Sequence, residues 1–188
     1  LAQNERLTAT ATRNNLLNIN AAAAKDCPPL FLPMRLLSKL TSVQEASIGF
    51  AHSRLSKDSG CIIAMGMGLG KTLVTLSLCF SHLVDHPEND ILIVAPKTII
   101  PHWRAERQKW SELCDLTFNS FIALEGSSAA FEEAILRFNQ QVEGVTAKVG
   151  HVFVVNPEML KTFCRKCPAF APSLILVDEG HRVASNHS

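Results

Sequence analysis

A chain of 188 residues is long enough to bury one hydrophobic core of the size found in a single domain. Its 18 basic and 17 acidic residues leave a formal net charge of +1, so composition gives no general argument for nucleic-acid binding and any track for DNA must be local. No apolar run approaches the roughly 20 residues of a membrane-spanning helix, so we expect no such helix.

The first part of the chain, residues 1–32, is rich in Ala, Asn and Thr and shows no sustained periodicity before Cys27-Pro28-Pro29. Sequence of this kind predicts a mobile or weakly helical extension. A helical pattern begins near Met34 and runs towards Phe50. We therefore predict that the folded domain occupies residues 33–188.

Apolar runs and helical stripes alternate along the rest of the chain. Near-continuous apolar runs are typical of strands buried on both faces, and apolar residues three and four apart are typical of helices that pack on a sheet. This alternation favours an α/β fold with a parallel sheet and right-handed crossovers. The predicted strands are 61–64, 91–95, 121–124, 152–155 and 174–177, and the clearest helical stripes are Leu73, Leu76, Phe80 and Leu83, and Phe131, Ala134, Ile135 and Phe138.

A glycine-rich segment links the first predicted strand to the first helical stripe. This order is the context of a phosphate-binding loop, in which backbone N–H groups surround a polyphosphate and the helix N-terminus adds its dipole. Lys71 can reach the β- and γ-phosphates, and the Thr72 hydroxyl can ligate Mg²⁺. Met65 stands where the general motif has its first glycine. The residues predicted to bind the nucleotide phosphates are Met67, Gly68, Leu69, Gly70, Lys71 and Thr72.

Two acidic residues, Asp178 and Glu179, directly follow the last apolar run. Asp178 is suited to hold Mg²⁺ through water, and Glu179 can orient and deprotonate the water that attacks the γ-phosphate. A solvated acid pair at the end of a strand is the common alternative, but the phosphate-binding loop earlier in the chain favours a nucleotide site. We predict that this site lies at the C-terminal edge of the sheet.

With these two motifs, the chain resembles the Swi/Snf-type family of DNA-dependent ATPases and chromatin remodellers, which belong to the helicase-like superfamily 2. Residues 67–72 are similar to motif I of that family, and Asp178-Glu179-Gly180-His181-Arg182 are similar to motif II. Residues 91–97, with Trp103 and Glu106 after them, resemble motif Ia and its Trp-x-x-Glu helix. The resemblance covers residues 33–188. It implies a RecA-like P-loop NTPase lobe, a mostly parallel sheet sandwiched by helices, with ATP and Mg²⁺ as cofactors.

The resemblance also implies roles for individual residues. Gln44 lies in an element similar to the family's Leu-x-Pro-His/Tyr-Gln and is the implied reader of adenine. Lys97 and Thr98 are the implied contacts to the DNA backbone, and His181 is implied to couple the nucleotide state to neighbouring motifs. Glu179 is implied as the catalytic base, with Lys71 as the catalytic cation.

The sequence departs from the family pattern at three places. Met65 and Gly66 replace the acidic pair that precedes motif I in most members. Val43 replaces the aromatic residue before the adenine-reading Gln, and Pro157 replaces a Tyr. None of these changes removes a group assigned to phosphate, Mg²⁺ or the attacking water.

The implied function is ATP hydrolysis that drives movement along double-stranded DNA, in chromatin remodelling or DNA repair. The implied partners are double-stranded DNA, a second RecA-like lobe in the same polypeptide and chromatin proteins, and the implied location is the nucleus. Two alternatives stay open. One is a nucleotide-gated scaffold that binds ATP without turnover, and the other is a different P-loop NTPase such as a metabolic kinase.

The cysteine and tryptophan residues are interpreted without a direct role in chemistry. Six cysteines without a recognisable signal peptide suit a reducing compartment. Cys164 and Cys167 form a lone C-x-x-C, which we expect to be plain thiols rather than half of a zinc site. Trp103 and Trp110 lie seven residues apart, hence on one helical face, and are predicted to pack rather than to stack on bases.

Overall fold

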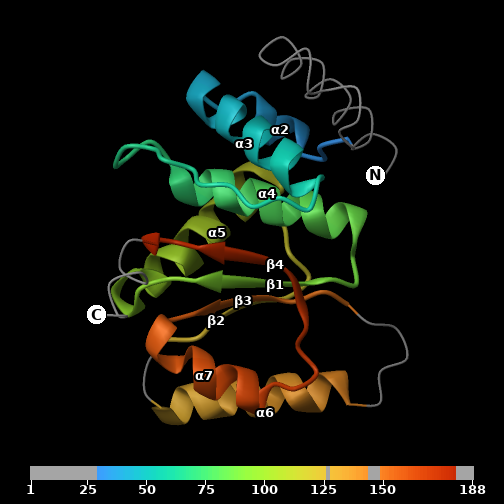
Figure 1. The fold of residues 1–188 in the computed structure, drawn as a ribbon, viewed down its shortest axis with the longest axis vertical. Coiled ribbons are helices and arrows are strands. Elements are labelled where there is room, and N and C mark those ends of the chain that lie inside the picture. Colours follow the sequence, from blue (N-terminus) through green and yellow to red (C-terminus); the bar gives the residue numbers. More distant parts are fainter. Residues whose placement is uncertain (1–28, 126–127, 144–148, 181–188) are drawn as a thin grey trace. The chain divides into compact units, whose positions relative to one another are not determined.

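The computed structural model describes residues 29–125, 128–143 and 149–180 (Figure 1). Two compact units contain them, one built from residues up to Asp85 and from Glu106–Thr117, the other from His86–Ala105 and from Phe118 onwards. The first unit holds α2 (Met34–Leu37), α3 (Ser42–Leu55) and α4 (Lys71–Asp85). The second holds β1 (Asp90–Val94), the 3-10 turn η1 (Lys97–Ile99), β2 (Phe121–Ala123), α6 (Ser128–Val142), β3 (Val152–Val155), α7 (Pro157–Lys166) and β4 (Pro172–Val177). Helix α5 (Ile100–Cys114) begins in the second unit and ends in the first.

The second unit is built on a four-stranded sheet with the order β2-β3-β1-β4. All three strand pairs are parallel, and Val94 of β1 is in register with Val155 of β3 and Val177 of β4. Parallel neighbours require crossover connections, and helices α5, α6 and α7 each lie between two strands in the chain. The predicted α/β fold with a parallel sheet is confirmed.

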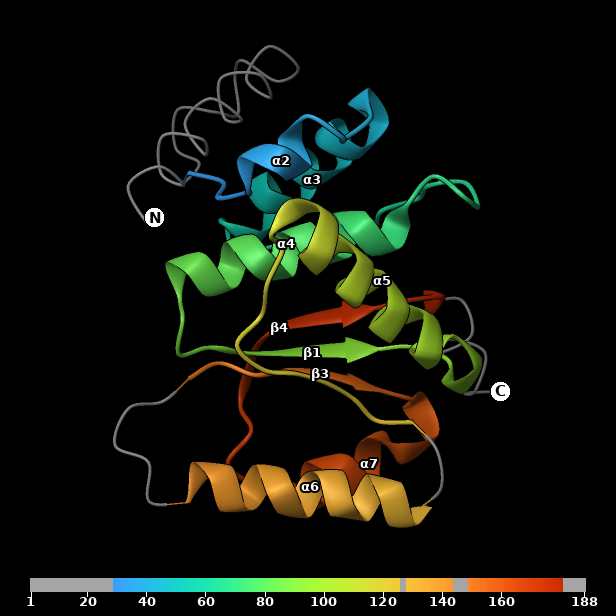
Figure 2. The same ribbon diagram turned by 180° about the vertical axis from the view of Figure 1, so that it is seen from behind.

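The core of the second unit lies between the sheet and helices α6 and α7, which cover the same face of the sheet (Figure 2). The ring of Phe153 on β3 lies 5.0 Å from that of Phe138 on α6 and 4.9 Å from that of Phe163 on α7. Tilted and edge-on aromatic pairs of this kind contribute about 0.5–1.5 kcal/mol each beyond the apolar area that they bury. The buried cluster comprises Leu92, Val94, Leu124, Phe131, Ile135, Phe138, Phe153, Val155, Phe163 and Cys167. Three of these residues, Phe131, Ile135 and Phe138, belong to the predicted helical stripe that forms the buried face of α6.

A buried carboxylate ties together the N-terminal ends of three strands. Asp90, at the start of β1, is only 1% exposed. Its Oδ1 accepts the backbone N–H of His151, just before β3, and its Oδ2 accepts that of Ala171, just before β4. The imidazole Nδ1 of His151 lies 3.4 Å from Asp90 Oδ1. A buried charge is tolerated only when it is hydrogen-bonded, and here its partners stand 61 and 81 residues away along the chain.

The first unit contains three helices and a buried N-terminal segment that bonds to α4. Thr41 and Gln44 form a capping box that starts α3, so the single helical pattern expected from Met34 onwards is divided into α2 and α3. Leu30, Phe31 and Leu32 are buried, and the Phe31 N–H donates to Ser81 Oγ at 3.0 Å. These three residues therefore pack within the first unit, and the domain boundary at residue 33 stays a prediction. Residues 1–28 of the predicted extension 1–32 lie outside the described residues.

One predicted strand is wrong. Residues 61–64 form neither a helix nor a strand, and Ile62 is 88% exposed. An apolar run becomes a strand only if a neighbouring strand satisfies its backbone hydrogen bonds, and the described sheet does not include this segment. β4 is an edge strand whose Ile175 is 59% exposed, so it is less buried than its apolar sequence predicts. No helix among the described residues has the length and apolar character needed to cross a membrane.

Candidate functional site

The glycine-rich loop leads directly into α4 and depends on glycine at two positions. Gly68 and Gly70 have φ values of +76° and +83°, in the left-handed region that favours glycine. A Cβ added at Gly70 would also overlap the side-chain nitrogen of Gln44. The loop is open to solvent at Gly66, Met67, Gly68 and Leu69. Its conformation therefore depends on the backbone freedom of these glycines, and residues 66–69 are accessible to solvent.

Lys71 and Thr72 are the first two residues of α4, where backbone N–H groups lack intrahelical partners. The Lys71 ammonium turns back over its own loop and donates to the backbone oxygen of Met65 at 3.1 Å. The Val74 N–H donates to the Gly70 oxygen at 3.1 Å and so starts the helical ladder. Lys71 and Thr72 are both partly exposed. The helix dipole, the loop and the ammonium group together suit a bound polyphosphate.

Gln44 holds the loop in place from the first turn of α3. Its Oε1 accepts the Thr41 N–H at 3.0 Å, and its Nε2 donates to the Leu69 carbonyl oxygen at 3.0 Å. Each end of the amide thus makes one bond and keeps one free valence, a donor at Nε2 and an acceptor at Oε1. The structure therefore brings the predicted adenine reader to the predicted phosphate loop, and gives it an anchoring role that the sequence did not indicate.

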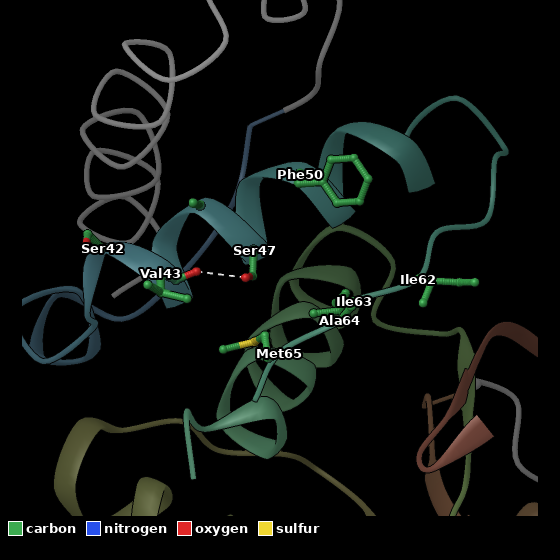
Figure 3. A pocket seen from close by; sticks show the side chains of 9 residues that line it. Ser42, Val43, Ser47, Phe50, Ile62, Ile63, Ala64 and Met65 are labelled. Atoms are coloured by element: carbon green, nitrogen blue, oxygen red, sulfur yellow. Dashed lines mark hydrogen bonds between the residues drawn. The ribbon is translucent and has the colours of Figure 1, made fainter. Parts of the chain in front are cut away.

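An open pocket of about 410 Å³ lies beside this part of the first unit (Figure 3). Helix α3 forms one wall and the segment that leads into the loop forms the other. The only polar side chains that line it are two serines, and the Ser47 hydroxyl already donates to the Val43 oxygen at 2.8 Å. The lining residues are Ser42, Val43, Ala46, Ser47, Phe50, Ile62, Ile63, Ala64 and Met65. The pocket is thus mostly apolar and suits a flat ring rather than a phosphate.

The acidic pair stands at the C-terminal end of β4 in the second unit. The Asp178 N–H donates to the Val94 oxygen at 2.8 Å, which ties the residue to β1. Its Oδ1 accepts the Glu179 N–H at 2.9 Å, and its Oδ2 accepts the indole Nε1–H of Trp103 at 3.2 Å. Glu179 has a φ of 52°, which is uncommon for a residue other than glycine and is often found at functional sites. Both acids are partly exposed.

The predicted DNA contacts lie at the same edge of the sheet as the acidic pair. Lys97 and Thr98 follow β1 in the turn η1, and both are exposed. Because β1 and β4 are parallel neighbours, their C-terminal ends meet at one edge. The structure therefore brings Lys97, Thr98, Asp178 and Glu179 to one edge of the second unit. The phosphate loop and Gln44 belong to the first unit, and His181 lies outside the described residues.

Sequence reasoning missed the polar role of Trp103. The residue was predicted to pack, and it is buried, but its indole N–H also reaches Asp178. Only a general rule could have predicted this bond: a buried tryptophan usually donates its indole N–H to an acceptor. Trp110 makes a similar bond, at 2.7 Å, to Glu106 Oε2 four residues earlier in α5. The sequence could not indicate that one of the two bonds ends on a predicted Mg²⁺ ligand.

The structure describes five of the six cysteines, and all five are free. Within the ranges that the structure covers, no group of three or more His, Cys, Asp or Glu residues is placed to hold a metal ion. Cys164 is exposed and Cys167 is buried, and both are free. Burial, together with the neighbouring Cys164, raises the pKa of the Cys167 thiol to about 11. The interpretation of Cys164 and Cys167 as plain thiols stays a prediction.

Comparison with known proteins connects both the glycine-rich loop and the acidic pair to one family. Residues 43–188 match the SNF2-related domain. The chain is 48% identical over 178 residues to the bifunctional helicase and thymine dioxygenase JBP2 of Trypanosoma cruzi, and 50% identical over 182 residues to that of Leishmania braziliensis. These alignments cover 94% and 96% of this chain but 16% of each relative. The DNA repair and recombination protein RAD54-like of Drosophila ananassae is 28% identical over 137 residues, which are 68% of this chain and 16% of that protein.

Adenine recognition gives a first test of the site. We expect Gln44→Ala to weaken the binding of both ATP and GTP, because the loop loses its bond at Leu69, and to reduce the preference for ATP, because the free amide valences are lost. Competition against a fluorescent ATP analogue measures both effects. The control is Gln108→Ala, which removes an exposed amide from α5. An unchanged ATP/GTP preference would show that Gln44 only anchors the loop.

Proposed function

Because the chain belongs to the SNF2-related family of helicase-like ATPases, we propose that it is the ATP-binding lobe of a DNA-dependent ATPase that moves along double-stranded DNA. The observation that carries the proposal is the glycine-rich loop. It combines two left-handed glycines, a lysine folded over the loop and the N-terminus of a 15-residue helix. Few ligands other than a polyphosphate need all three features.

The residues present fit Mg²⁺ and ATP. Lys71 is held only by a backbone oxygen, which a phosphate oxygen can replace as its partner. The Asp178 carboxylate offers about four acceptor positions, of which the Glu179 and Trp103 N–H groups use two. The remaining positions can hold water bound to Mg²⁺, and Thr72 supplies a hydroxyl ligand from the loop. Bound Mg²⁺ would neutralise charge on the β- and γ-phosphates.

We assign the chemical step to Glu179. Its carboxylate orients the attacking water and accepts its proton, while Lys71 stabilises the charge that develops on the γ-phosphate. Adenine contacts the apolar pocket beside α3, and the free donor and acceptor of Gln44 read its edge. Val43 supplies the apolar contact that an aromatic residue makes elsewhere in the family.

The rest of the proposal concerns partners. Lys97 and Thr98 follow β1 and are exposed. In this proposal the Lys97 ammonium attracts the phosphates of the DNA backbone, and the Thr98 hydroxyl donates a hydrogen bond to them. The chain spans about 16% of the length of its curated relatives, so a second RecA-like lobe and further domains are proposed for the whole protein. The names of those relatives support a whole protein that joins a helicase to a thymine dioxygenase. We further propose a nuclear location, with chromatin proteins among the partners. His181 is proposed to couple the nucleotide state to neighbouring motifs.

The alternative is a nucleotide-gated scaffold that binds ATP without turnover. It is favoured by Met65 and Gly66, which replace the acidic pair found before motif I in most family members. ATPase activity of the full-length protein, measured with and without double-stranded DNA, separates the two. A DNA-stimulated rate supports the motor, whereas tight binding without hydrolysis under both conditions supports the scaffold.

A lysine substitution tests the phosphate loop directly. We expect Lys71→Ala to weaken binding of a fluorescent ATP analogue roughly ten- to a hundredfold, because a charge-assisted hydrogen bond is lost. The fold should survive, since Lys71 is partly exposed and bonds only to the Met65 oxygen. The control is Lys57→Ala, which removes an exposed lysine of the same unit from the turn after α3. If Lys71→Ala binds as tightly as the wild type, the phosphate-loop assignment fails.

A further inference from the structure

Three hydrogen bonds fix Asp178 at the end of β4. The backbone N–H bonds to Val94, and the two carboxylate oxygens accept different donors, the Glu179 N–H at Oδ1 and the Trp103 indole N–H at Oδ2. The Glu179 bond is local and follows from the backbone turn. The Trp103 bond joins residues 75 positions apart, so it is the one that sets the orientation of the carboxylate relative to another element.

Trp103 is well suited to hold that orientation. It lies in the first turn of α5 and is 1% exposed, so its ring cannot easily change rotamer. The indole has one donor and no acceptor, and the donor points at a single oxygen of Asp178. The bond is charge-assisted and excludes water from one side of the carboxylate. Asp178 is partly exposed, and each of its carboxylate oxygens keeps an acceptor position that can face a hydrated cation.

We propose that Trp103 is a positioning residue for Asp178, and that it fixes the carboxylate in the orientation that holds the water shell of Mg²⁺. The role of Asp178 as a Mg²⁺ ligand rests on the proposed function, whereas the hydrogen bond itself does not. Hydrogen bonds from outside the ligand shell orient metal ligands in the same way in other sites, and their loss typically costs ten- to a hundredfold in metal affinity or activity.

The chain contains its own control. It has two tryptophans, and Trp110 also donates its indole N–H to a carboxylate, that of Glu106. Both tryptophans belong to α5. Unlike Asp178, Glu106 is not a predicted ligand of any cation. A Trp→Phe substitution at either position removes one N–H···carboxylate bond and keeps a large apolar ring. Only the substitution at Trp103 should affect the response to Mg²⁺.

The first experiment tests the bond in the metal-free 188-residue chain. Its ¹H–¹⁵N spectrum should contain two indole cross-peaks, which Trp103→Phe and Trp110→Phe assign. We expect Asp178→Ala to move the Trp103 cross-peak and to leave that of Trp110 in place, and Glu106→Ala to do the reverse. A Trp103 cross-peak that does not respond to Asp178→Ala would overturn the proposal. This outcome does not depend on whether the protein binds or hydrolyses ATP.

The second experiment tests positioning in the full-length protein. ATPase activity is measured against Mg²⁺ concentration at a fixed ATP concentration. We expect Trp103→Phe to raise the half-maximal Mg²⁺ concentration roughly tenfold, with most of the rate recovered at saturating Mg²⁺, and Trp110→Phe to change neither value. Equal effects of the two variants, or a loss of rate that Mg²⁺ does not relieve, would overturn the positioning role. A wild-type protein without any ATPase activity would instead overturn the proposed function.

Discussion

Glu179→Gln is expected to abolish ATP turnover in the full-length protein while ATP binding is kept or becomes tighter. Gln has the same shape as Glu but cannot accept a proton from the attacking water, and loss of a general base costs roughly 10²–10⁴ in rate. The substitution leaves Asp178 in place, because the bond to Asp178 Oδ1 comes from the backbone N–H of residue 179. Single-turnover hydrolysis and binding of a fluorescent ATP analogue, measured side by side, separate chemistry from affinity.

The control for this variant is Glu158→Gln, which changes an exposed glutamate in the first turn of α7. It should hydrolyse ATP as the wild type does. If Glu179→Gln also hydrolyses ATP normally, another group activates the water and the assignment of the base is wrong. If instead it loses ATP binding, Glu179 supports the structure of the site rather than its chemistry.

The parts of the fold that the sequence predicted are those set by local patterns. The stripe that contains Leu73, Leu76 and Phe80 forms α4, and the apolar run predicted as a strand at 91–95 forms β1. The glycines of the loop could be predicted as well, because a left-handed φ is a property of the single residue. Four of the five predicted strands appear in the sheet.

The failures have a common cause, since each depends on residues that are distant in the sequence. Residues 61–64 have the composition of a buried strand, but composition does not specify a hydrogen-bonding neighbour, and in the structure they form no strand. Asp90 looks like an ordinary turn residue. Its burial depends on N–H groups of His151 and Ala171, which no local pattern around Asp90 can indicate.

The candidate site follows the same rule. The types of its residues could be predicted, but not the bonds that hold them. The capping box of Thr41 and Gln44 is a readable local pattern, whereas the bond from Gln44 to Leu69 crosses 25 residues. The bond from Trp103 to Asp178 crosses 75 residues and joins two motifs that the sequence presents separately. Such bonds orient the side chains that carry chemistry.

The 188-residue chain alone is expected to bind Mg·ATP weakly, to hydrolyse it negligibly and to respond little to DNA. In the proposed function its residues supply a phosphate cradle, a Mg²⁺ ligand and a base. We expect the second lobe to add an arginine that stabilises the transition state. An arginine finger contributes roughly 10³–10⁵ in turnover in phosphoryl-transfer enzymes. Lys97 and Thr98 provide few phosphate contacts, and binding through few contacts is weak and sensitive to salt.

The test compares this chain with a longer polypeptide that adds the proposed second lobe. ATPase rates are measured for both with and without double-stranded DNA at low and moderate salt. The longer polypeptide should show DNA-stimulated hydrolysis at a rate at least about 10³ times that of the chain, the lower bound of an arginine finger's contribution. The Glu179→Gln variant of the chain, purified in the same way, reports the rate of any contaminating ATPase. Strong DNA-stimulated hydrolysis by the chain alone, above that of its Glu179→Gln variant, would mean that one lobe contains a complete catalytic site.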